Sequence, residues 1–380
     1  MATAIKTASL QTRNISLDVF RGMTVCFMII VNTPGSGTSF SPLQHATWNG
    51  FTPTDLVFPS FLFAVGNAQS FVANKWGTMT QSAVVWKILK RTALIFLLGY
   101  LMYWFPFFDL DKNHNIIAAP IKNTRIMGVL QRIALCYGIA SLMIYFLKIR
   151  TTVIICVMLL FLYWILLYMF GDAAAPLSLQ GNAGFKLDKW LMGESHMYHG
   201  EGMAFDPEGW LSTLPAIGNV VGGFLVGKWI QQKGNTYEGL TKLLLSGFTL
   251  LVCGYFWDLL FPINKKLWTS SFVVYTVGLD CIIISVITYI IQFQKVVKWA
   301  GFFQVFGKNT LFIYLLSELL VTVLFMVPVG PKSSLFRWIY INIFSHAGEY
   351  LGSLLFAIAY MLVCWSVGYW LDKKKIYVKV

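Results

Sequence analysis

A histidine and an aspartate stand ten residues apart in a short polar segment between two apolar stretches. These are His45 and Asp55. An imidazole backed by a carboxylate is typical of a general base or a nucleophile. Asp55 also fits a simpler role, because the run 52–55 (Thr-Pro-Thr-Asp) is typical of a helix N-terminus in which the acid caps the backbone. The pair therefore predicts base or nucleophile chemistry, and a capping role for Asp55 stays open beside it.

Ionisable residues also lie inside the apolar stretches, where a charge is costly and usually faces a protein interior or a wet cavity. They are Asp18, Arg21, Arg132, Asp258, Asp280 and Glu318. Asp18 and Arg21 fit an internal ion pair. Arg132 lies two helical turns deeper than Arg125, so we expect it to meet one of the other acids or an anionic ligand.

The first apolar stretch carries polar groups at two depths of one helix face. Asp18, Arg21 and Asn32 are spaced so that a helix places them on the same side. Arg21 and Asn32 are then about 16 Å apart along the axis. Asn32 stands where the stretch gives way to the segment that holds His45, so we predict that the two residues share a site.

The composition excludes several classes of protein. Hydrophobic residues make up 57% of the 380 residues and charged residues only 12%, which does not fit a disordered chain, a disulfide scaffold or an ordinary soluble enzyme. The net charge of +13 lies between apolar stretches, which favours membrane topology over a nucleic-acid partner. The six cysteines lie in apolar stretches without metal-ligand spacing, so we predict neither a metal site nor disulfides.

Ten apolar runs are each long enough to cross a bilayer. They lie at 17–33, 56–74, 84–105, 126–147, 152–170, 210–230, 240–261, 270–292, 306–327 and 350–371. The piece 335–345 is shorter and predicts a re-entrant or interfacial helix. The expected fold is an all-α polytopic membrane helix bundle of about ten transmembrane helices, forming one domain over residues 1–380.

The distribution of Lys and Arg orients these spans. Most of them lie in segments that are cytoplasmic if the N-terminus is cytoplasmic, and ten spans then place the C-terminus there as well. Residues 1–15 form a cytoplasmic tail in this arrangement. Residues 171–209 form the longest outer segment, which we expect to cap the site.

Five separated segments resemble one group of membrane enzymes. SLDVFRG at 16–22 resembles the opening signature of the transmembrane acyltransferases. Four others resemble the heparan-alpha-glucosaminide N-acetyltransferase family and its bacterial relatives. These are HATWNGFT at 45–52 with DLVFP at 55–59, RIMGVLQR at 125–132, DPEG at 206–209 and PINKKLW at 262–268.

The resemblance implies transfer of an acetyl group from acetyl-CoA, on one side of the membrane, to a glucosamine amine on the other. In that family the histidine of the His-Ala-x-Trp-x-Gly motif is catalytic, which maps onto His45. The chain resembles a short form, without the extra luminal domain and additional N-terminal span of the lysosomal members. We therefore expect a bacterial inner-membrane enzyme whose partners are an amino sugar, acetyl-CoA and the lipid bilayer, and a homodimer stays open.

Each candidate residue then has an expected role. His45 is the general base or acetyl carrier, Asp55 fixes its tautomer, and Asn32 donates to the developing oxyanion. The residues expected to bind substrate are Trp48, Asn49, Arg125, Arg132, Trp190, His196, Asp206, Glu208, Asn264 and Lys265. Those expected to meet the phosphates of acetyl-CoA are Arg21, Lys87, Lys90 and Arg91. Asp206-Pro207-Glu208 is also predicted to start the sixth span, and plain topological charge is the alternative for residues 87–91.

Two other functions remain open. A proton- or ion-coupled sugar transporter would use Arg132, Asp258, Asp280 and Glu318 as ion sites, but it has no special need for a histidine in a short outer segment. An acyltransferase acting on a lipid-linked or surface glycan would share the machinery and differ in its acceptor.

Overall fold

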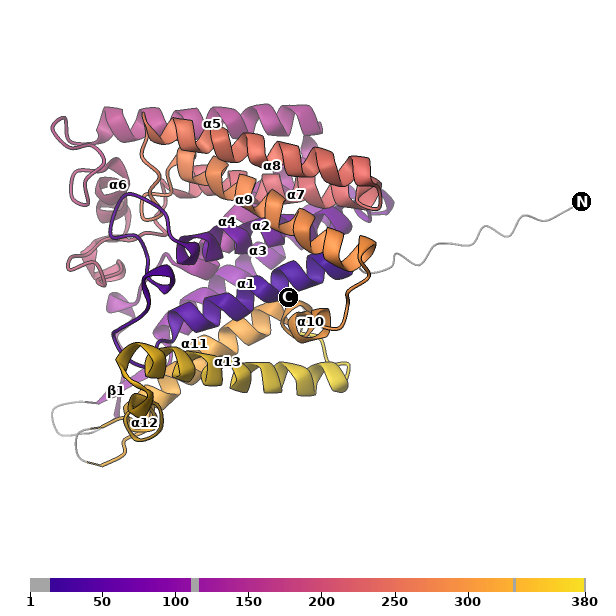
Figure 1. The fold of residues 1–380 in the computed structure, drawn as a ribbon. Helices are drawn as coiled ribbons and strands as arrows, with labels where there is room; N and C mark the ends of the chain where they lie inside the picture. The colour runs from indigo at the N-terminus through magenta and orange to yellow at the C-terminus, as the bar shows by residue number, and fades with distance from the viewer. Residues whose placement is uncertain (1–13, 111–115, 331–332, 379–380) are drawn as a thin grey trace, which may run out of the picture.

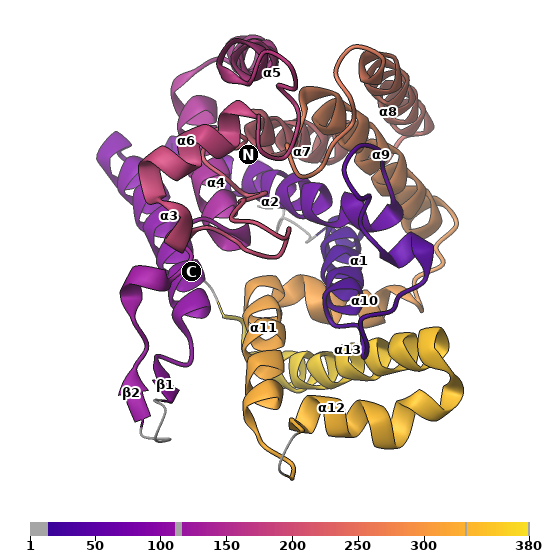
Figure 2. The same ribbon diagram turned by 90° about the vertical axis from the view of Figure 1, so that its left-hand side faces the viewer.

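A computed structural model describes residues 14–110, 116–330 and 333–378. Long helices form one bundle (Figure 1). They are α1 (Ile15–Asn32), α2 (Val57–Ala73), α3 (Gln81–Trp104), α4 (Val129–Phe146), α5 (Ile149–Phe170), α7 (Thr213–Lys233), α8 (Tyr237–Asp258), α9 (Ser270–Thr288), α11 (Thr310–Met326) and α13 (Glu349–Lys373). Of these, α11 and α13 are tilted against the others (Figures 1 and 2). The shorter helices are α6 (Ala183–Met192), α10 (Ala300–Lys308) and α12 (Leu335–Ile339).

The strands in the described part form one small hairpin. β1 (Phe108–Leu110) pairs antiparallel with β2 (Ile116–Ala118). The predicted all-α membrane bundle is therefore confirmed. The predicted tail 1–15 lies almost wholly outside the described residues.

Each predicted span corresponds to a long helix, but one of these helices, α3, is less apolar than a membrane span usually is. Eight helices of the described part are long and apolar enough to cross a membrane, and nine if α10 and α11 count as one broken span. α3 has sufficient length, but Lys87, Lys90 and Arg91 lie in its first half. Its cations reduce its apolar character, although it packs beside α4 in the same bundle (Figure 2).

The ninth predicted run, 306–327, is not one straight helix. α10 and α11 meet at an angle of 82°, and the corner is Asn309. Its side chain donates to the Ile376 carbonyl (2.9 Å) and accepts from the Val378 amide (3.0 Å). The corner is therefore in contact with the C-terminal segment, a partner that the local sequence does not reveal.

Close backbone approach brings α10 against α1. A Cβ atom added at Gly22 would lie 1.8 Å from the Phe303 carbonyl oxygen, and one added at Gly307 would lie 2.1 Å from the Asp18 carbonyl oxygen. Only glycine permits such an approach at both positions. α10 is thereby held across the N-terminal half of α1.

The piece 335–345 is helical, as predicted. α12 continues into one wide turn at Tyr340–Phe344. Phe336 is buried and its ring packs 4.6 Å from that of Phe356 on α13.

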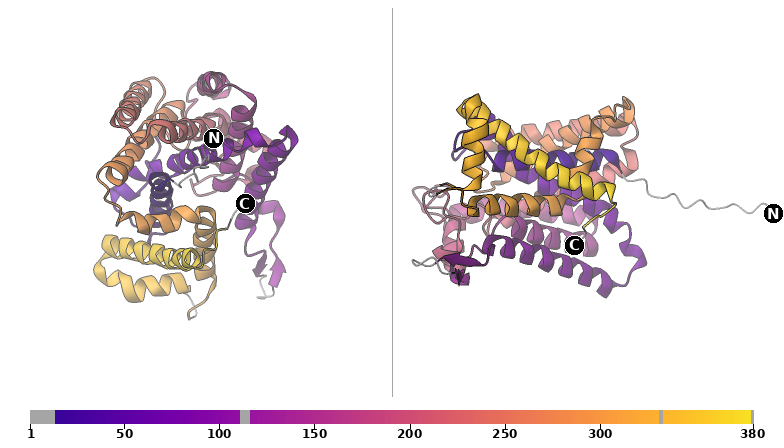
Figure 3. Two further views of the ribbon diagram at one scale, coloured as in Figure 1. Left: turned by 90° about the vertical axis from the view of Figure 1, so that its right-hand side faces the viewer. Right: turned by 90° about the horizontal axis from the view of Figure 1, so that it is seen from below.

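The two ends of the bundle differ in character. α6, the hairpin and α12 gather at one end, which faces the viewer in Figure 2. The N-terminal end of α1 and the C-terminal end of α13 lie at the other end, beside α10 (Figures 1 and 3). Large apolar side chains of α5 and α8 are exposed at the periphery, as expected where helices meet lipid.

The sixth span starts later than predicted. The sequence predicts Asp206-Pro207-Glu208 at its first turn, but α7 begins at Thr213. The segment instead forms a separate turn, in which the Glu208 amide donates to Asp206 Oδ1 (3.1 Å) and the Gly209 amide donates to the Asp206 carbonyl (3.1 Å). Further turns through Trp210 and Leu211 precede the regular helix, so Asp206 is not a cap of α7.

Candidate active site

A cavity of about 400 Å³ opens at the loop-rich end of the bundle. Its walls come from the C-terminal ends of α1 and α3, the starts of α2 and α4, the middle of α11, and the segments around residues 45, 201 and 265. The polar side chains in its lining are Asn32, His45, Thr54, Asp55, Tyr103, Arg125, Tyr198, Glu201, Glu208, Lys265, Lys266, Tyr314 and Glu318. The cavity is thus mixed in charge and lies where the predicted residues of the first two spans meet.

His45 and Asp55 form a hydrogen-bonded pair in this cavity. His45 Nδ1 lies 2.7 Å from Asp55 Oδ1. The other oxygen of Asp55 accepts from the amides of Ala46 (3.1 Å) and Thr52 (3.0 Å). The predicted capping box with Thr52 is present, so one carboxylate caps the helix start and contacts the imidazole.

This arrangement defines the roles of the two ring nitrogens. A carboxylate without a proton is an acceptor only, so Nδ1 of His45 carries the proton that it donates to Asp55. Nε2 of the neutral ring then has a free lone pair. The His45 side chain is 44% exposed while that of Asp55 is 1% exposed, so the base faces the cavity from a buried support.

Lys265 packs against the same imidazole. Its Nζ lies 3.0 Å from Nδ1 and 3.1 Å from Nε2 of His45. Because Lys265 Nζ is almost equally far from both nitrogens, it does not lie along the lone-pair axis of either. The Nε2 lone pair is therefore not directed at Lys265. Burial lowers the pKa of Lys265, although the carboxylates of Asp55 and Glu208 oppose this shift.

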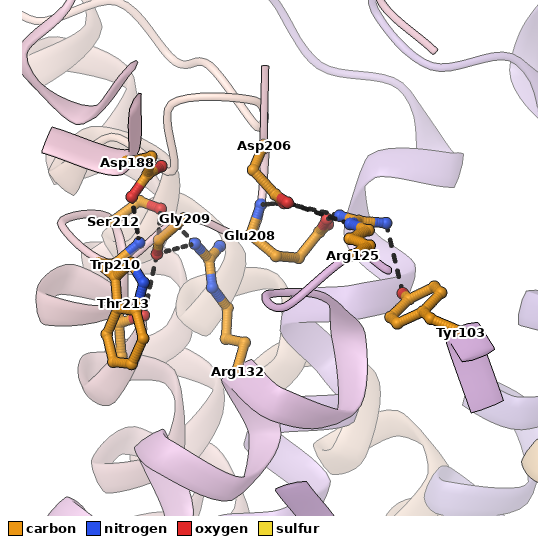
Figure 4. Close-up of polar contacts among 10 residues, drawn as sticks. All are labelled: Tyr103, Arg125, Arg132, Asp188, Asp206, Glu208, Gly209, Trp210, Ser212 and Thr213. Carbon is orange, nitrogen blue, oxygen red and sulfur yellow. Dashed lines mark hydrogen bonds and ion pairs between the residues drawn. The ribbon is translucent and has the colours of Figure 1, made fainter. Parts of the chain in front are cut away.

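Arg125 is held by two acids of the 206–209 segment. Its Nε and Nη2 donate to the two oxygens of Asp206 (3.0 and 2.6 Å), and Nη2 also donates to Glu208 Oε2 (2.5 Å). Figure 4 shows this pairing, with Tyr103 on the far side of the guanidinium. Burial opposes the charge, but these acids hold the pKa of Arg125 well above its ordinary value.

The two acids respond to that neighbour differently. Burial raises the pKa of Asp206, and the contact with Arg125 offsets this only in part. Burial also disfavours the charge on Glu208, but Arg125 and Arg132 hold the pKa of Glu208 below its ordinary value. Glu208 is therefore the more strongly ionised of the pair.

Arg132 lies deeper and is fully buried. Its Nη2 donates to Ser212 Oγ and to the Gly209 carbonyl (3.1 Å), and its guanidinium lies 4.8 Å from the Trp268 ring centre. It stands beside the 209–213 turns in Figure 4. Within the described residues, Nε and Nη1 have no hydrogen-bond partner.

The acids expected as partners of Arg132 have other contacts. Asp258 accepts from the Ile263 amide, and Asp280 accepts from the Ser60 hydroxyl. Glu318 accepts from Asn32 Nδ2 at 3.5 Å. None of these acids forms an ion pair with Arg132 among the described residues, so Arg132 serves the 209–213 turns instead.

Several predicted substrate-binding residues lie outside the cavity lining. Trp48 Nε1 donates to the Leu177 carbonyl (2.9 Å), and Asn264 Nδ2 donates to Asn49 Oδ1 (3.1 Å). His196 Nδ1 lies 2.7 Å from the Thr124 carbonyl, and Trp190 is 79% exposed. Their roles in binding substrate stay predictions.

The predicted acetyl-CoA contacts also lie away from this cavity. Arg21 pairs with Asp18 on α1, as expected for an internal ion pair. The Arg91 guanidinium lies 4.9 Å from the ring centre of Tyr137. Lys87 and Lys90 share the first half of α3 with Arg91. Whether this group contacts phosphate stays a prediction.

Sequence reasoning missed several residues of the cavity wall. Tyr103, Tyr198 and Tyr314 contribute rings from three separate elements, and Glu201 pairs with Lys266. Aromatic residues near helix ends are common in membrane proteins, so the tyrosines carry no signal of a site. Glu318 did carry a signal, because an acid inside an apolar run is unusual.

Comparison with known proteins gives two relatives of one kind. No family model matches the chain. The mouse heparan-alpha-glucosaminide N-acetyltransferase is 25% identical over an alignment of 426 positions, and the alignment covers 96% of this chain and 60% of that protein. The human protein of the same name is 25% identical over an alignment of 372 positions, which covers 81% of this chain and 53% of that protein. The chain thus spans between about half and three-fifths of the length of these two relatives. The matches confirm its resemblance to the heparan-alpha-glucosaminide N-acetyltransferases.

Proposed function

We propose that the chain is a membrane acyltransferase that moves an acetyl group from acetyl-CoA to the amine of a glucosamine-type sugar. The observation that carries this proposal is the His45–Asp55 pair, with an exposed imidazole at a cavity and a buried carboxylate behind it. The relatives are named for acetyl transfer to a glucosaminide nitrogen. An imidazole of this kind supplies the base that such a transfer needs.

The chemical step begins with a deprotonated amine. As the amine nitrogen bonds to the thioester carbonyl carbon, His45 Nε2 takes its proton. The carbon–sulfur bond then breaks, and the departing thiolate receives the proton from Nε2. Asp55 stabilises the imidazolium that exists between these two transfers, because its oxygen accepts from Nδ1.

His45 also fits a second route to the same products. Nε2 attacks the thioester first, the thiolate leaves, and the acetyl group is carried on the ring until the amine displaces it. Labelled acetyl-CoA without acceptor separates the routes, because only this one leaves label on the protein, and only where His45 is intact.

Two donors are placed to stabilise the oxyanion that forms at the carbonyl. Asn32 and Lys265 both line the cavity with His45. An amide or ammonium donor aimed at the developing charge contributes roughly 3 kcal/mol to catalysis when it is preorganised. We assign this role to Asn32, with Lys265 as the second donor.

The sugar occupies the outer part of the cavity in this proposal. Tyr198, Glu201 and Glu208 belong to the outer segment 171–209, and their side chains line the cavity. Arg125 Nε and Nη2 are engaged by Asp206 and Glu208, which holds this wall in place, and Nη1, beside Tyr103, is the donor left for a sugar hydroxyl. The residues Trp48, Asn49, Arg132, Trp190, His196, Asn264 and Lys265 extend or support the same wall.

We further propose that acetyl-CoA enters from the cytoplasm and the sugar from the opposite side. The N-terminal end of α1 and the C-terminal end of α13 lie at the end of the bundle opposite α6 (Figure 1). His45 lines the cavity with Asn32, at the other end of α1. Arg21, Lys87, Lys90 and Arg91 stand toward the end opposite α6 and fit contact with the phosphates of the donor. A bacterial inner membrane is the natural setting for this orientation.

The test uses the purified full chain in detergent with labelled acetyl-CoA. Glucosamine is the acceptor, and glucose, which has a hydroxyl in place of the amine, is the matched control. We expect labelled N-acetylglucosamine and no labelled glucose ester. A folded protein that transfers no label to any amino sugar would remove the proposed function.

A further inference from the structure

Four carboxylates line the cavity, and three of them have a cationic neighbour. Asp55 lies near the ammonium of Lys265, Glu201 pairs with Lys266, and Glu208 pairs with Arg125. The fourth is Glu318 on α11, and it differs from the others in this respect.

The Glu318 carboxylate has a single polar partner among the described residues, and that partner is neutral. Asn32 Nδ2 donates to Glu318 Oε1 over 3.5 Å. No Lys, Arg or His in the described part of the chain forms an ion pair with this carboxylate. Acids within membrane-spanning helices are costly and are usually paired with a cation or used in function.

The cations of the cavity are already engaged elsewhere. Arg125 is held by Asp206 and Glu208. Lys266 pairs with Glu201, and Lys265 lies against His45. Within the described residues of the cavity no cation is therefore left for Glu318, and its carboxylate is open to a cationic ligand.

We propose that Glu318 binds the protonated amine of the acceptor sugar. This inference rests on the proposed function, in which the acceptor is an amino sugar. Primary amines carry a proton near neutral pH, so the acceptor arrives as an ammonium ion. A carboxylate that faces a cavity and lacks a cationic partner is complementary to that ion.

The same contact places the amine for reaction. Glu318 and His45 line one cavity, and Asn32 lies in that cavity beside Glu318. The ammonium gives one proton to the Glu318 carboxylate and becomes a neutral amine. The amine nitrogen then bonds to the acetyl carbon and gives a second proton to His45 Nε2, which passes it to the departing thiolate.

The product also differs from the substrate at this contact. An N-acetylated sugar has a neutral amide where the ammonium was, so it cannot form an ion pair with Glu318. The site therefore favours binding of an amino sugar over a sugar with a hydroxyl in that position. It also favours release of the N-acetylated product.

The experiment measures binding without turnover. Glucosamine is titrated calorimetrically into the purified full chain in detergent, without acetyl-CoA, and glucose and N-acetylglucosamine serve as neutral probes. We expect wild type to bind glucosamine more tightly than either neutral sugar. Equal binding of the three sugars by wild type would overturn the proposal, and this comparison needs no variant.

Three variants locate the contact. Glu318→Gln keeps the shape and a hydrogen bond to Asn32 but loses the charge, and we expect glucosamine binding to weaken at least about tenfold. Glu318→Asp keeps the charge and should retain part of the preference for the amine. Glu349→Gln, at an exposed carboxylate that contacts Thr38, is the matched control and should bind as wild type does. Wild-type affinity in a folded Glu318→Gln protein would overturn the assignment.

The results for glucosamine binding and for acetyl transfer distinguish failure of this site from failure of the proposed reaction. Glu318-dependent glucosamine binding without acetyl transfer by wild type would support this site and remove the proposed reaction. Acetyl transfer with glucosamine affinity independent of Glu318 would support the reaction and remove this site.

Discussion

Asp55 joins the imidazole of His45 to the start of α2. Its Oδ1 lies 2.7 Å from His45 Nδ1, and its Oδ2 accepts from the amides of Ala46 and Thr52. Asp55 is fully buried, so the carboxylate has little freedom to leave either set of contacts. The helix cap thereby fixes the position of the group that orients the base.

Replacing Asp55 with asparagine should slow acetyl transfer strongly. The amide nitrogen of the new side chain donates where the carboxylate accepts, which favours the wrong tautomer of His45. We expect turnover to fall by roughly 100-fold or more. The measurement is the rate of labelled N-acetylglucosamine formation, normalised to folded protein.

The matched control for this prediction is Thr52→Ala. It removes the capping hydroxyl, which lies 3.0 Å from Asp55 Oδ2, but leaves the His45 contact. We expect a loss of stability of about 1 kcal/mol with turnover close to wild type. If Asp55→Asn lowers the melting temperature and leaves turnover unchanged, Asp55 is only a helix cap.

Arg132→Ala should destabilise the protein rather than alter substrate affinity. The change removes hydrogen bonds to Ser212 and Gly209, removes the contact with the Trp268 ring, and leaves a buried void. We expect a loss of about 3 kcal/mol in the free energy of unfolding. Thermal and denaturant unfolding in detergent measure it.

The kinetic arm of that experiment decides between two roles. If Arg132 acts only through the 209–213 turns, the Michaelis constant for the sugar should stay near wild type in the folded fraction. A raised Michaelis constant with unchanged stability would show that Arg132 contacts the substrate.

Asp188 should make the outer segment more stable at acidic pH. Burial raises the pKa of Asp188 to about 7, from an ordinary value near 3.8. The folded protein therefore holds a proton on Asp188 that the unfolded chain releases, and stability falls as pH rises from about 4 to about 7. Above that range the cost is constant.

Asp188→Asn isolates this effect. Asparagine can still accept from the Trp210 amide, which lies 2.9 Å from Asp188 Oδ1, and it cannot ionise. We expect the melting temperature of wild type, measured relative to the variant, to decline as pH rises from about 4 to about 7. A difference that does not change with pH would show that Asp188 does not titrate in this range.

The part of the site that lies in one short segment could be predicted from the sequence. His45 and Asp55 are ten residues apart, and the Thr-Pro-Thr-Asp run at 52–55 fixes the acid at the start of a helix. A local pattern therefore determined a local contact. The same holds for Asp18 and Arg21, which are neighbours on one helix face.

Contacts between distant segments could not be predicted in this way. Arg132 meets Ser212 across 80 positions, and Lys265 meets His45 across 220. An unusual charge in an apolar run indicates that a partner exists, but the identity of the partner depends on how the helices pack. Glu318 was recognisable as unusual for the same reason, while its place in the cavity was not.

The break at Asn309 is a feature of the fold that was not predicted from the sequence. The predicted run 306–327 begins across Gly-Lys-Asn-Thr at 307–310, which are four residues without an apolar side chain. At the bend of 82°, Asn309 donates to the carbonyl of residue 376 and accepts from the amide of residue 378. The local sequence thus contains an interruption, but the distant contacts made at the bend could not be predicted from it.

The central claim is tested most directly by comparing His45→Ala with wild type in the transfer of labelled acetyl groups to glucosamine. Gln44→Ala, one residue away and outside the cavity lining, controls for disturbance of the segment. The account predicts that His45→Ala loses at least about 100-fold in rate while its melting temperature stays near that of wild type and Gln44→Ala remains active. A folded His45→Ala protein that transfers acetyl groups at the wild-type rate would contradict it.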